Sequence, residues 1–163
     1  MALYVCSLIR STDQLIPPNQ YTIVRFPFGA AESYDAWDMH QVAQPDGYSI
    51  TSWDTDGRSG LIWPHVTGWG WLTAMVFWEG GSYSETRDRF VRDPLNLSTG
   101  YDSTATEDEQ PTPGGQYKSK HHEMFVHPGT PVAFLVKHND SVSRRITHAQ
   151  FKLAIEADVA VPA

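Results

Sequence analysis

The residues from 68 to 78 constrain the fold more than any other part of the chain. This stretch, GWGWLTAMVFW, is uncharged and rich in aromatic and other residues that favour strands. Read as a strand, alternate side chains fall on two faces: Trp69, Trp71, Thr73, Met75 and Phe77 on one, and Leu72, Ala74, Val76 and Trp78 on the other. Because both faces are mostly apolar, the pattern predicts a strand that is buried on both sides or lies against a neighbouring subunit.

A buried helix is the alternative interpretation of this stretch. Gly68 and Gly70 within it, and the Glu-Gly-Gly turn at residues 79–81, favour a strand because they limit the segment to strand length. We therefore expect residues 68–78 to form the central strand of a β-sandwich.

Other segments of strand length surround this central strand, and almost no helix signal accompanies them. They are residues 2–9, 21–26, 48–51, 60–63, 86–91, 122–126, 131–137 and 146–157. Short strands separated by turn residues are typical of an antiparallel sandwich, here with about eight strands. The length of 163 residues indicates one domain spanning residues 1–163. Residues 93–115 are polar and rich in Ser, Thr, Gly and Pro, so we expect a long exposed loop there.

Composition excludes several classes of partner. The net charge of −7 argues against a nucleic-acid-binding protein, because phosphate contacts need clustered lysines and arginines. The single cysteine, Cys6, allows no internal disulfide and suits a reducing compartment. No signal-peptide pattern opens the sequence and no apolar run reaches membrane-spanning length, so we expect no membrane partner.

Several local patterns follow one another in a characteristic order. They are YTIVRF at residues 21–26, the acidic and aromatic segment 32–40 ending in Met-His, Leu61-Ile62-x-Pro64 before Gly68-x-Gly70, Ala74-x-Val76-x-Trp78, and the closing hairpin at 129–139 and 147–153. In this order they resemble the small jelly-roll proteins of tailed bacteriophages that share the fold of the C1q and tumour-necrosis-factor head domains. The resemblance covers residues 20–157, and it departs from the family at residues 93–115 and in the tryptophan-rich middle.

The resemblance implies a homotrimer of jelly rolls in a virion, as a capsid decoration protein, a head fibre or a tail knob. The expected fold begins at residue 2 without a heptad stalk, which favours a capsid-attached protein. Its partners would then be copies of itself and the major capsid protein, on the outer capsid surface or tail, after synthesis in the host cytoplasm. One alternative is a receptor- or glycan-binding module of a head fibre or tail that contacts a host-surface glycan. Another is a cellular or secreted sugar-binding sandwich.

Metal and cofactor chemistry finds little support in the sequence. His121 and His122 would point to opposite faces of a strand, so with His127 they are more typical of solvent or interface histidines than of a metal site. The Asp54–Gly57 segment is similar to the start of a calcium loop but lacks its later ligands, which favours an ordinary turn. We predict no metal and no cofactor.

Catalytic groups are equally sparse. No G-x-S-x-G elbow occurs, and Cys6 lies in an expected buried strand, where its thiol would be inert. The acidic pairs Glu107/Glu109 and Asp35/Asp38 leave open whether two carboxylates face each other across a cleft. The first pair is more typical of a solvated loop. We therefore predict no enzymatic role.

The tryptophans and arginines are the candidates for interaction. Trp69, Trp71, Trp78 and Phe77 favour the core or the trimer interface, with sugar stacking on Trp69 and Trp71 as the alternative. Candidates for contact with an outside partner are the tryptophans nearer expected loops and the arginines of an edge-like strand: Trp37, Trp53, Trp63, Arg87, Arg89 and Arg92. A solvated charged face is the alternative for the arginines.

Overall fold

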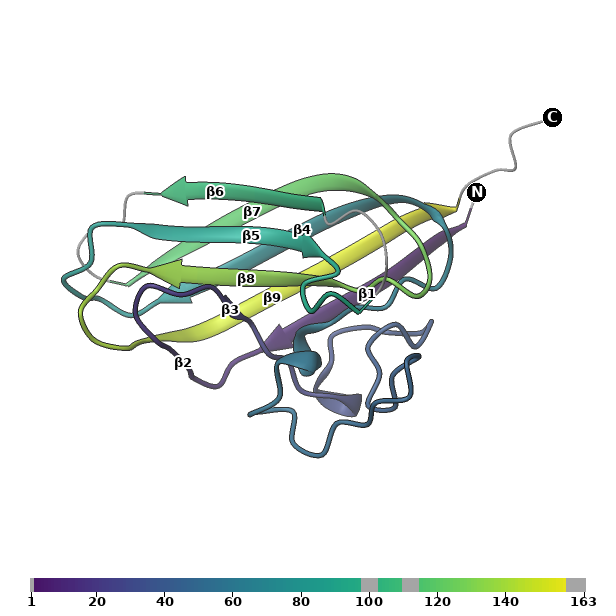
Figure 1. Cartoon of the computed structure of the whole chain (residues 1–163), viewed down its shortest axis with the longest axis horizontal. Helices are drawn as coiled ribbons and strands as arrows, with labels where there is room; N and C mark the ends of the chain where they lie inside the picture. The colour runs from purple at the N-terminus through teal and green to yellow at the C-terminus, as the bar shows by residue number, and fades with distance from the viewer. Residues whose placement is uncertain (1, 98–102, 110–114, 158–163) are drawn as a thin grey trace.

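Two antiparallel sheets pack face to face in the computed structural model, which describes residues 2–97, 103–109 and 115–157 (Figure 1). The five-stranded sheet has the order β1-β9-β4-β7, with β2 also paired to β9, and the four-stranded sheet has the order β3-β8-β5-β6. The strands are β1 Leu3–Arg10, β2 Gln14–Ile16, β3 Thr22–Ile23, β4 Gly68–Trp78, β5 Thr86–Arg92, β6 Ser103–Glu109, β7 Gln116–Val126, β8 Val132–His138 and β9 Arg144–Ala157. Two short 3-10 helices, η1 Gly29–Ala31 and η2 Gly57–Gly60, lie between β3 and β4. None of the helices in the described residues is long and apolar enough to cross a membrane.

Strand β4 has the bounds that the sequence predicts, and it lies inside the five-stranded sheet. It pairs along its whole length with β7 on one side and β9 on the other. Its even-numbered residues, such as Leu72 and Val76, are fully buried between the sheets. Its odd-numbered residues remain partly or largely exposed in the single chain. Only one face of the central strand is therefore covered by the chain itself.

The glycine that opens β4 is required by the close approach of β9. A Cβ atom at Gly68 would lie 2.0 Å from the carbonyl oxygen of Glu156, which belongs to the backbone of the paired strand. Backbone cannot move aside as a flexible side chain can. The residue that marks the start of the strand in the sequence thus also permits its pairing.

A cluster of phenylalanines joins the two sheets. Phe90 of β5, Phe134 of β8 and Phe151 of β9 are at most 1% exposed, and their ring centroids lie 5.7–6.4 Å apart. Phe26, from the segment after β3, adds a fourth ring 6.4 Å from Phe151. Such tilted and offset contacts are favourable for aromatic rings. This cluster explains how a chain of modest hydrophobic content builds a continuous core.

A buried arginine ties the start of the chain to the four-stranded sheet. Arg10 is 2% exposed, and its guanidinium donates to the carbonyl oxygens of Thr12, Asp13 and Arg25 and to the side-chain oxygens of Thr12 and Gln14. The Gln14 amide in turn donates to the carbonyl oxygen of Ile23 in β3. Because each buried donor has an acceptor, the charge is tolerated inside the fold.

Three expected strands differ from the structure. Within residues 21–26 only Thr22 and Ile23 form a strand, although the amide of Val24 still donates to the carbonyl oxygen of Phe134 in β8. Segments 48–51 and 60–63 supply single bridges, Ala43–Ser49 and Ile62–Val132. Prolines and glycines around these segments cut them shorter than a ladder needs. As a result, residues 24–67 form the irregular region that lies below the sheets in Figure 1.

The prediction of a long exposed loop at residues 93–115 is wrong for residues 103–109. Residues 103–109 form β6, which pairs with β5 along its whole length. The polar sequence STATEDE concealed this strand because β6 lies at the edge of its sheet, where backbone pairing does not need an apolar face. Residues 98–102 and 110–114 lie outside the described residues.

Candidate interaction surfaces

The outer surface of the five-stranded sheet carries a group of aromatic side chains. The odd-numbered residues of β4 point away from the core, and in register beside them on β7 lie Phe125, opposite Trp69, and Tyr117, opposite Phe77. Trp69 is 44% exposed, Phe125 43% and Tyr117 60%, whereas Trp71, Met75 and Phe77 are half-buried. We call this set the aromatic face: Trp69, Trp71, Met75, Phe77, Tyr117 and Phe125.

Contacts within the aromatic face hold its rings in place. The indole Nε1 of Trp69 donates to Glu123 Oε2 at 3.1 Å. The rings of Phe77 and Tyr117 meet edge to face at 4.7 Å, and Tyr117 lies 6.2 Å from the ring of His148. Along β9, the register places the polar residues His148, Lys152 and Glu156 beside the β4 residues. The same register places Thr73, His121 and Lys152 side by side at the middle of this surface, so polar residues separate the aromatic pair Trp69 and Phe125 from the pair Phe77 and Tyr117.

Trp78 belongs to the core and not to this face. It is 2% exposed, and its ring makes an edge contact with His138 at 5.6 Å. The structure therefore separates the four residues that the sequence groups as core or interface. Trp78 lies inside, while Trp69, Trp71 and Phe77 lie on the outer surface of the same strand.

The outer surface of the four-stranded sheet carries positive charge. The guanidinium of Arg89 lies 3.6 Å from the ring centroid of Tyr21, a cation–π geometry, and Lys137 approaches the same ring at 5.4 Å. Arg87 pairs with Glu85 and stands opposite Lys137 in register. Arg92 is different, because its Nη1 donates to the carbonyl oxygen of Phe125 across the end of the sandwich. A partner role for these arginines stays a prediction.

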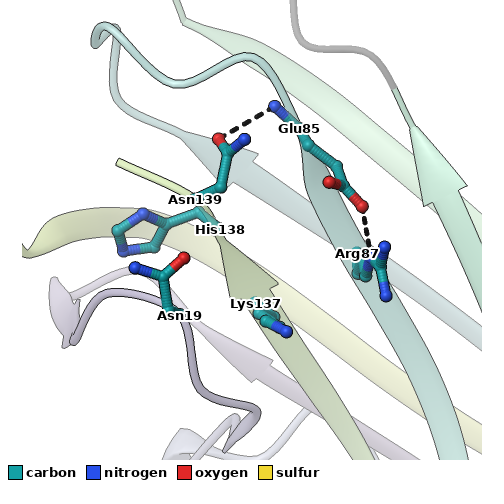
Figure 2. A pocket seen from close by; sticks show the side chains of 6 residues that line it. All are labelled: Asn19, Glu85, Arg87, Lys137, His138 and Asn139. Carbon is teal, nitrogen blue, oxygen red and sulfur yellow. Dashed lines mark hydrogen bonds and ion pairs between the residues drawn. The ribbon is translucent and has the colours of Figure 1, made fainter. Parts of the chain in front are cut away.

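A small pocket of about 80 Å³ lies beside this basic surface (Figure 2). The Asn139 side-chain oxygen accepts hydrogen bonds from the backbone amides of Ser84 and Glu85. His138 donates through Nε2 to the carbonyl oxygen of Ile16 and accepts at Nδ1 from the amide of Asp140. The hydrogen-bonding groups of Asn139 and His138 are thus paired within the protein, and the small volume leaves little room for a ligand.

The three candidate tryptophans of the loops have different environments. Trp37 is 38% exposed and packs against Tyr4 and His65, with ring centroids 4.5 Å and 5.4 Å away. Trp53 is half-buried, with the guanidinium of Arg10 5.1 Å from its ring. Trp63 does not fit the expectation of a surface contact, because it is only 3% exposed.

Burial of Trp63 follows from contacts with parts of the chain that are distant in sequence. Ile62 bridges to Val132 of β8, and the amide of Trp63 donates to the carbonyl oxygen of Met39. Trp63 thereby joins Leu61 and Ala133 in a second, smaller hydrophobic cluster. The apolar run Leu61-Ile62-Trp63 was the available signal for this packing, and nearness to Pro64 obscured it.

The candidate metal ligands do not converge. His121 and His122 are both exposed on opposite faces of β7, and His127 follows the end of that strand. Within the described residues, no three His, Cys, Asp or Glu side chains form a group that could hold a metal ion. The Asp54–Gly57 segment leads into η2, where the Asp56 carboxylate caps the helix by accepting from the amide of Arg58.

Cys6 is buried in β1, as the sequence predicts. Burial raises the pKa of its thiol far above the ordinary value, and the neighbouring carboxylates of Asp35 and Glu32 raise this pKa further. Because the thiolate is the reactive form, burial and the two carboxylates disfavour reaction at Cys6.

A larger pocket lies in the irregular region, where sequence reasoning found no site. We call it the loop pocket: about 490 Å³, lined by Phe28, Gly29, Glu32, Tyr34, Asp35, Asp38, His40 and Val42. Reciprocal backbone hydrogen bonds between Tyr34 and Ser7 fasten this segment to the free edge of β1. The Asp35 carboxylate accepts from the backbone amides of Met39 and His40, which fixes the turn. The concentration of acidic residues at 32–38 was the signal for this pocket, but not for its shape.

Comparison with known proteins identifies the fold from structure and not from sequence. No family model and no curated protein matches the sequence. Solved structures do match: the globular domain of zebrafish complement 1qA is 13% identical with a TM-score of 0.59, covering 91% of this chain and 94% of that one. Eiger TNF from S. frugiperda is 12% identical with a TM-score of 0.57, covering 99% and 97%, and murine APRIL at pH 8.0 is 10% identical with a TM-score of 0.57, covering 95% and 100%.

The chain has the C1q/TNF-like jelly-roll fold. This confirms the fold class that the sequence predicts, with nine strands in the described residues where about eight were expected. The proteins named above are complement and TNF-type domains, so the comparisons support the jelly roll but not the bacteriophage part of the resemblance.

Proposed function

We propose that the protein is a non-enzymatic structural module that forms a homotrimer through the aromatic face and decorates the outer shell of a bacteriophage capsid. The observation that carries the self-association is the aromatic face itself. Trp69, Tyr117 and Phe125 present large, partly exposed rings on adjoining strands, and aromatic side chains are enriched at protein interfaces. The resemblance noted from the sequence implies the same trimer.

The capsid role is supported by the sequence patterns that resemble phage jelly rolls. In this role, apolar surface is buried between subunits and polar loops contact the major capsid protein. Many equivalent modest contacts on one shell add up to strong attachment through multivalency. The trimer would be made in the host cytoplasm and act on the virion, with no nucleic acid or membrane as partner.

The first test is the solution mass of the full chain at low micromolar concentration. We expect a trimer for the natural sequence and a monomer for Trp69→Glu, because the new carboxylate would be buried against an apolar neighbour. The matched control is Val142→Glu, since Val142 is 52% exposed in the connection between β8 and β9 and is not part of the aromatic face, and this variant should remain trimeric. A natural chain that stays monomeric would contradict the proposal.

The capsid role needs a second measurement. Shells assembled without this protein are mixed with the trimer and sedimented, and we expect saturable co-sedimentation. Trimers that leave shells unbound at every concentration tested would refute decoration while leaving self-association intact.

A receptor- or glycan-binding module of a head fibre or tail is the second candidate, favoured by one observation. Trp37 is 38% exposed and is held by Tyr4 and His65, so it offers a fixed stacking surface for a sugar ring. Binding of the intact protein to cells or polysaccharide that Trp37→Ala removes would support this function. No binding by the intact protein would eliminate it.

A further inference from the structure

The loop pocket contains a buried ring nitrogen that has no hydrogen-bond partner among the described residues. His40 is one of its lining residues, and its side chain is fully buried and stacked on Phe28 at a centroid distance of 4.0 Å. Its Nε2 lies 2.6 Å from the carbonyl oxygen of Ser59. A carbonyl oxygen can only accept, so Nε2 carries the proton of this hydrogen bond.

The other ring nitrogen of His40 has no hydrogen-bond partner. Nδ1 is buried, and its nearest charged neighbour is Glu32 Oε1 at 3.4 Å. In neutral imidazole with Nε2 protonated, Nδ1 is an acceptor, and an ionised carboxylate is an acceptor too. The two therefore face each other without a proton between them. Glu32 Oε1 accepts from the backbone amide of Gly29, whereas Nδ1 has no donor among the described residues.

The remaining charges of the pocket have the same sign. Asp35 and Asp38 also line it, and none of the chain's lysines or arginines does. Burial raises the pKa of Asp35 above its ordinary value, and the charge of Glu32 raises this pKa further, against the lowering effect of the amides of Met39 and His40. Even a doubly protonated His40 would balance only one of the three carboxylates. The negative charge of the pocket therefore favours the binding of a cation.

The arrangement suits a polyatomic cation better than a metal ion. The described His and acidic side chains do not form a metal-binding group. The pocket also has apolar walls, because Tyr34 is 52% exposed and Val42 45% exposed along its lining. A long alkyl stem can lie along such a wall while its charged end reaches the carboxylates.

We propose that the loop pocket binds a cationic N–H donor, an ammonium or guanidinium group at the end of a flexible chain, which donates to Glu32 and to Nδ1 of His40. Two sources carry this chemistry: a lysine or arginine side chain of a protein, and a free alkylamine. This site is independent of the aromatic face and does not rest on the proposed trimer.

The test is a titration of the full-length protein at pH 7.5, followed by the backbone amide NMR signals of Gly29, Met39 and His40, which donate to Glu32 and Asp35. The probes are Nα-acetyl-lysine amide, Nα-acetyl-arginine amide and butylamine, with uncharged Nα-acetyl-norleucine amide as the matched control. We expect saturable shifts from the cations alone. Tighter binding of an amino-acid probe than of butylamine indicates a side chain as source, and equal binding indicates a free amine.

Variants assign the binding to named groups. Glu32→Gln should weaken it by about ten- to hundredfold, because a charge-assisted hydrogen bond is lost. Asp38→Asn, at an exposed residue with φ of 50° that asparagine tolerates, provides a second variant should the first misfold. Glu85→Gln makes the same change of charge on the other sheet and should leave binding unchanged.

Two results would overturn the proposal. The first is that no cation shifts these signals, or that the norleucine probe shifts them equally. The second is a free-protein spectrum in which both ring nitrogens of His40 are protonated together with no response to the probes, because His40 itself would then supply the donor to Glu32.

Discussion

Lys120 offers a sharp test of how the two sheets are held together. It lies on β7 with 6% exposure, and its Nζ is 3.2 Å from Asp88 Oδ1 of β5 and 3.3 Å from Glu107 Oε2 of β6. Two unit charges 3.2 Å apart attract by about 5 kcal/mol at an effective dielectric constant of 20. Glu107 is 52% exposed, so solvent screens the second pair and Asp88 is the principal partner.

Desolvation of the two buried charges offsets most of this attraction, so the intact pair contributes little net stability. Removing Lys120 is different, because the buried carboxylate of Asp88 then loses its ion pair. We expect Lys120→Met to lower the free energy of unfolding by about 3–5 kcal/mol. Adding Asp88→Leu to the same chain should restore most of that loss, since the buried carboxylate that lost its ion pair is then removed as well.

The assay is urea unfolding followed by circular dichroism, with all variants at one protein concentration. Lys137→Met is the matched control, because Lys137 lies on the outer surface of the other sheet and its contact with Tyr21 is worth at most about 1 kcal/mol. A loss below about 1 kcal/mol for Lys120→Met would refute the reasoning. A double variant that loses the sum of the two single losses would refute it equally, because independent sites add.

Three further predictions concern the backbone, the buried arginine and pH. Gly68→Ala should lower the free energy of unfolding by about 1–3 kcal/mol in the same urea assay, because its Cβ would collide with the paired backbone. The control is Gly57→Ala, whose Cβ would make only an ordinary contact at 3.8 Å, and its free energy of unfolding should change by no more than about 0.5 kcal/mol. Arg10→Met should lower the free energy of unfolding by about 3 kcal/mol or more, and the melting temperature by roughly 6–12 °C, because it removes a buried hydrogen-bond network. Arg145→Met is the control, since the Arg145 side chain is 54% exposed, and its melting temperature should change much less. Equal melting temperatures for the two variants would contradict the role of the buried network. Because burial raises the pKa of Asp35, the folded chain binds that proton more tightly than the unfolded chain, so this carboxyl makes stability fall as pH rises from its ordinary pKa through the raised one. Asp35→Asn should flatten that part of a series of urea midpoints against pH, and an unchanged slope would show that another group is responsible.

The elements that sequence reasoning located correctly are those whose own residues determine them. Residues 68–78 form β4 because an uncharged aromatic run between glycines has few alternatives to a buried strand. Strand β6 escaped notice because an edge strand is held by backbone pairing, which leaves no apolar pattern to detect.

The candidate sites show the same limit. The sequence predicts a partner contact for Trp63 because it lies near the expected loops, but its environment is decided by the bridge between Ile62 and Val132 of β8, seventy residues later in the chain. The acidic residues of the loop pocket are close together in sequence. In contrast, the acceptor role of His40 Nδ1 depends on the hydrogen bond between His40 Nε2 and the backbone carbonyl of Ser59. Contacts of this kind follow from the packing of the irregular region, and no local pattern encodes them.

Self-association and partner binding can be separated because they use different parts of the fold. The aromatic face lies over β4 and β7, whereas the loop pocket is fastened to the edge of β1, which is two strands away from β4 in the sheet order. A trimer built through the aromatic face would therefore leave the pocket and the basic surface of the other sheet open to further partners. Trp69→Glu should then abolish the trimer without changing the response of the pocket to a cation, and Glu32→Gln should do the reverse. If either variant removed both properties, the two surfaces would be coupled through the five-stranded sheet, and the division of roles between them would be wrong.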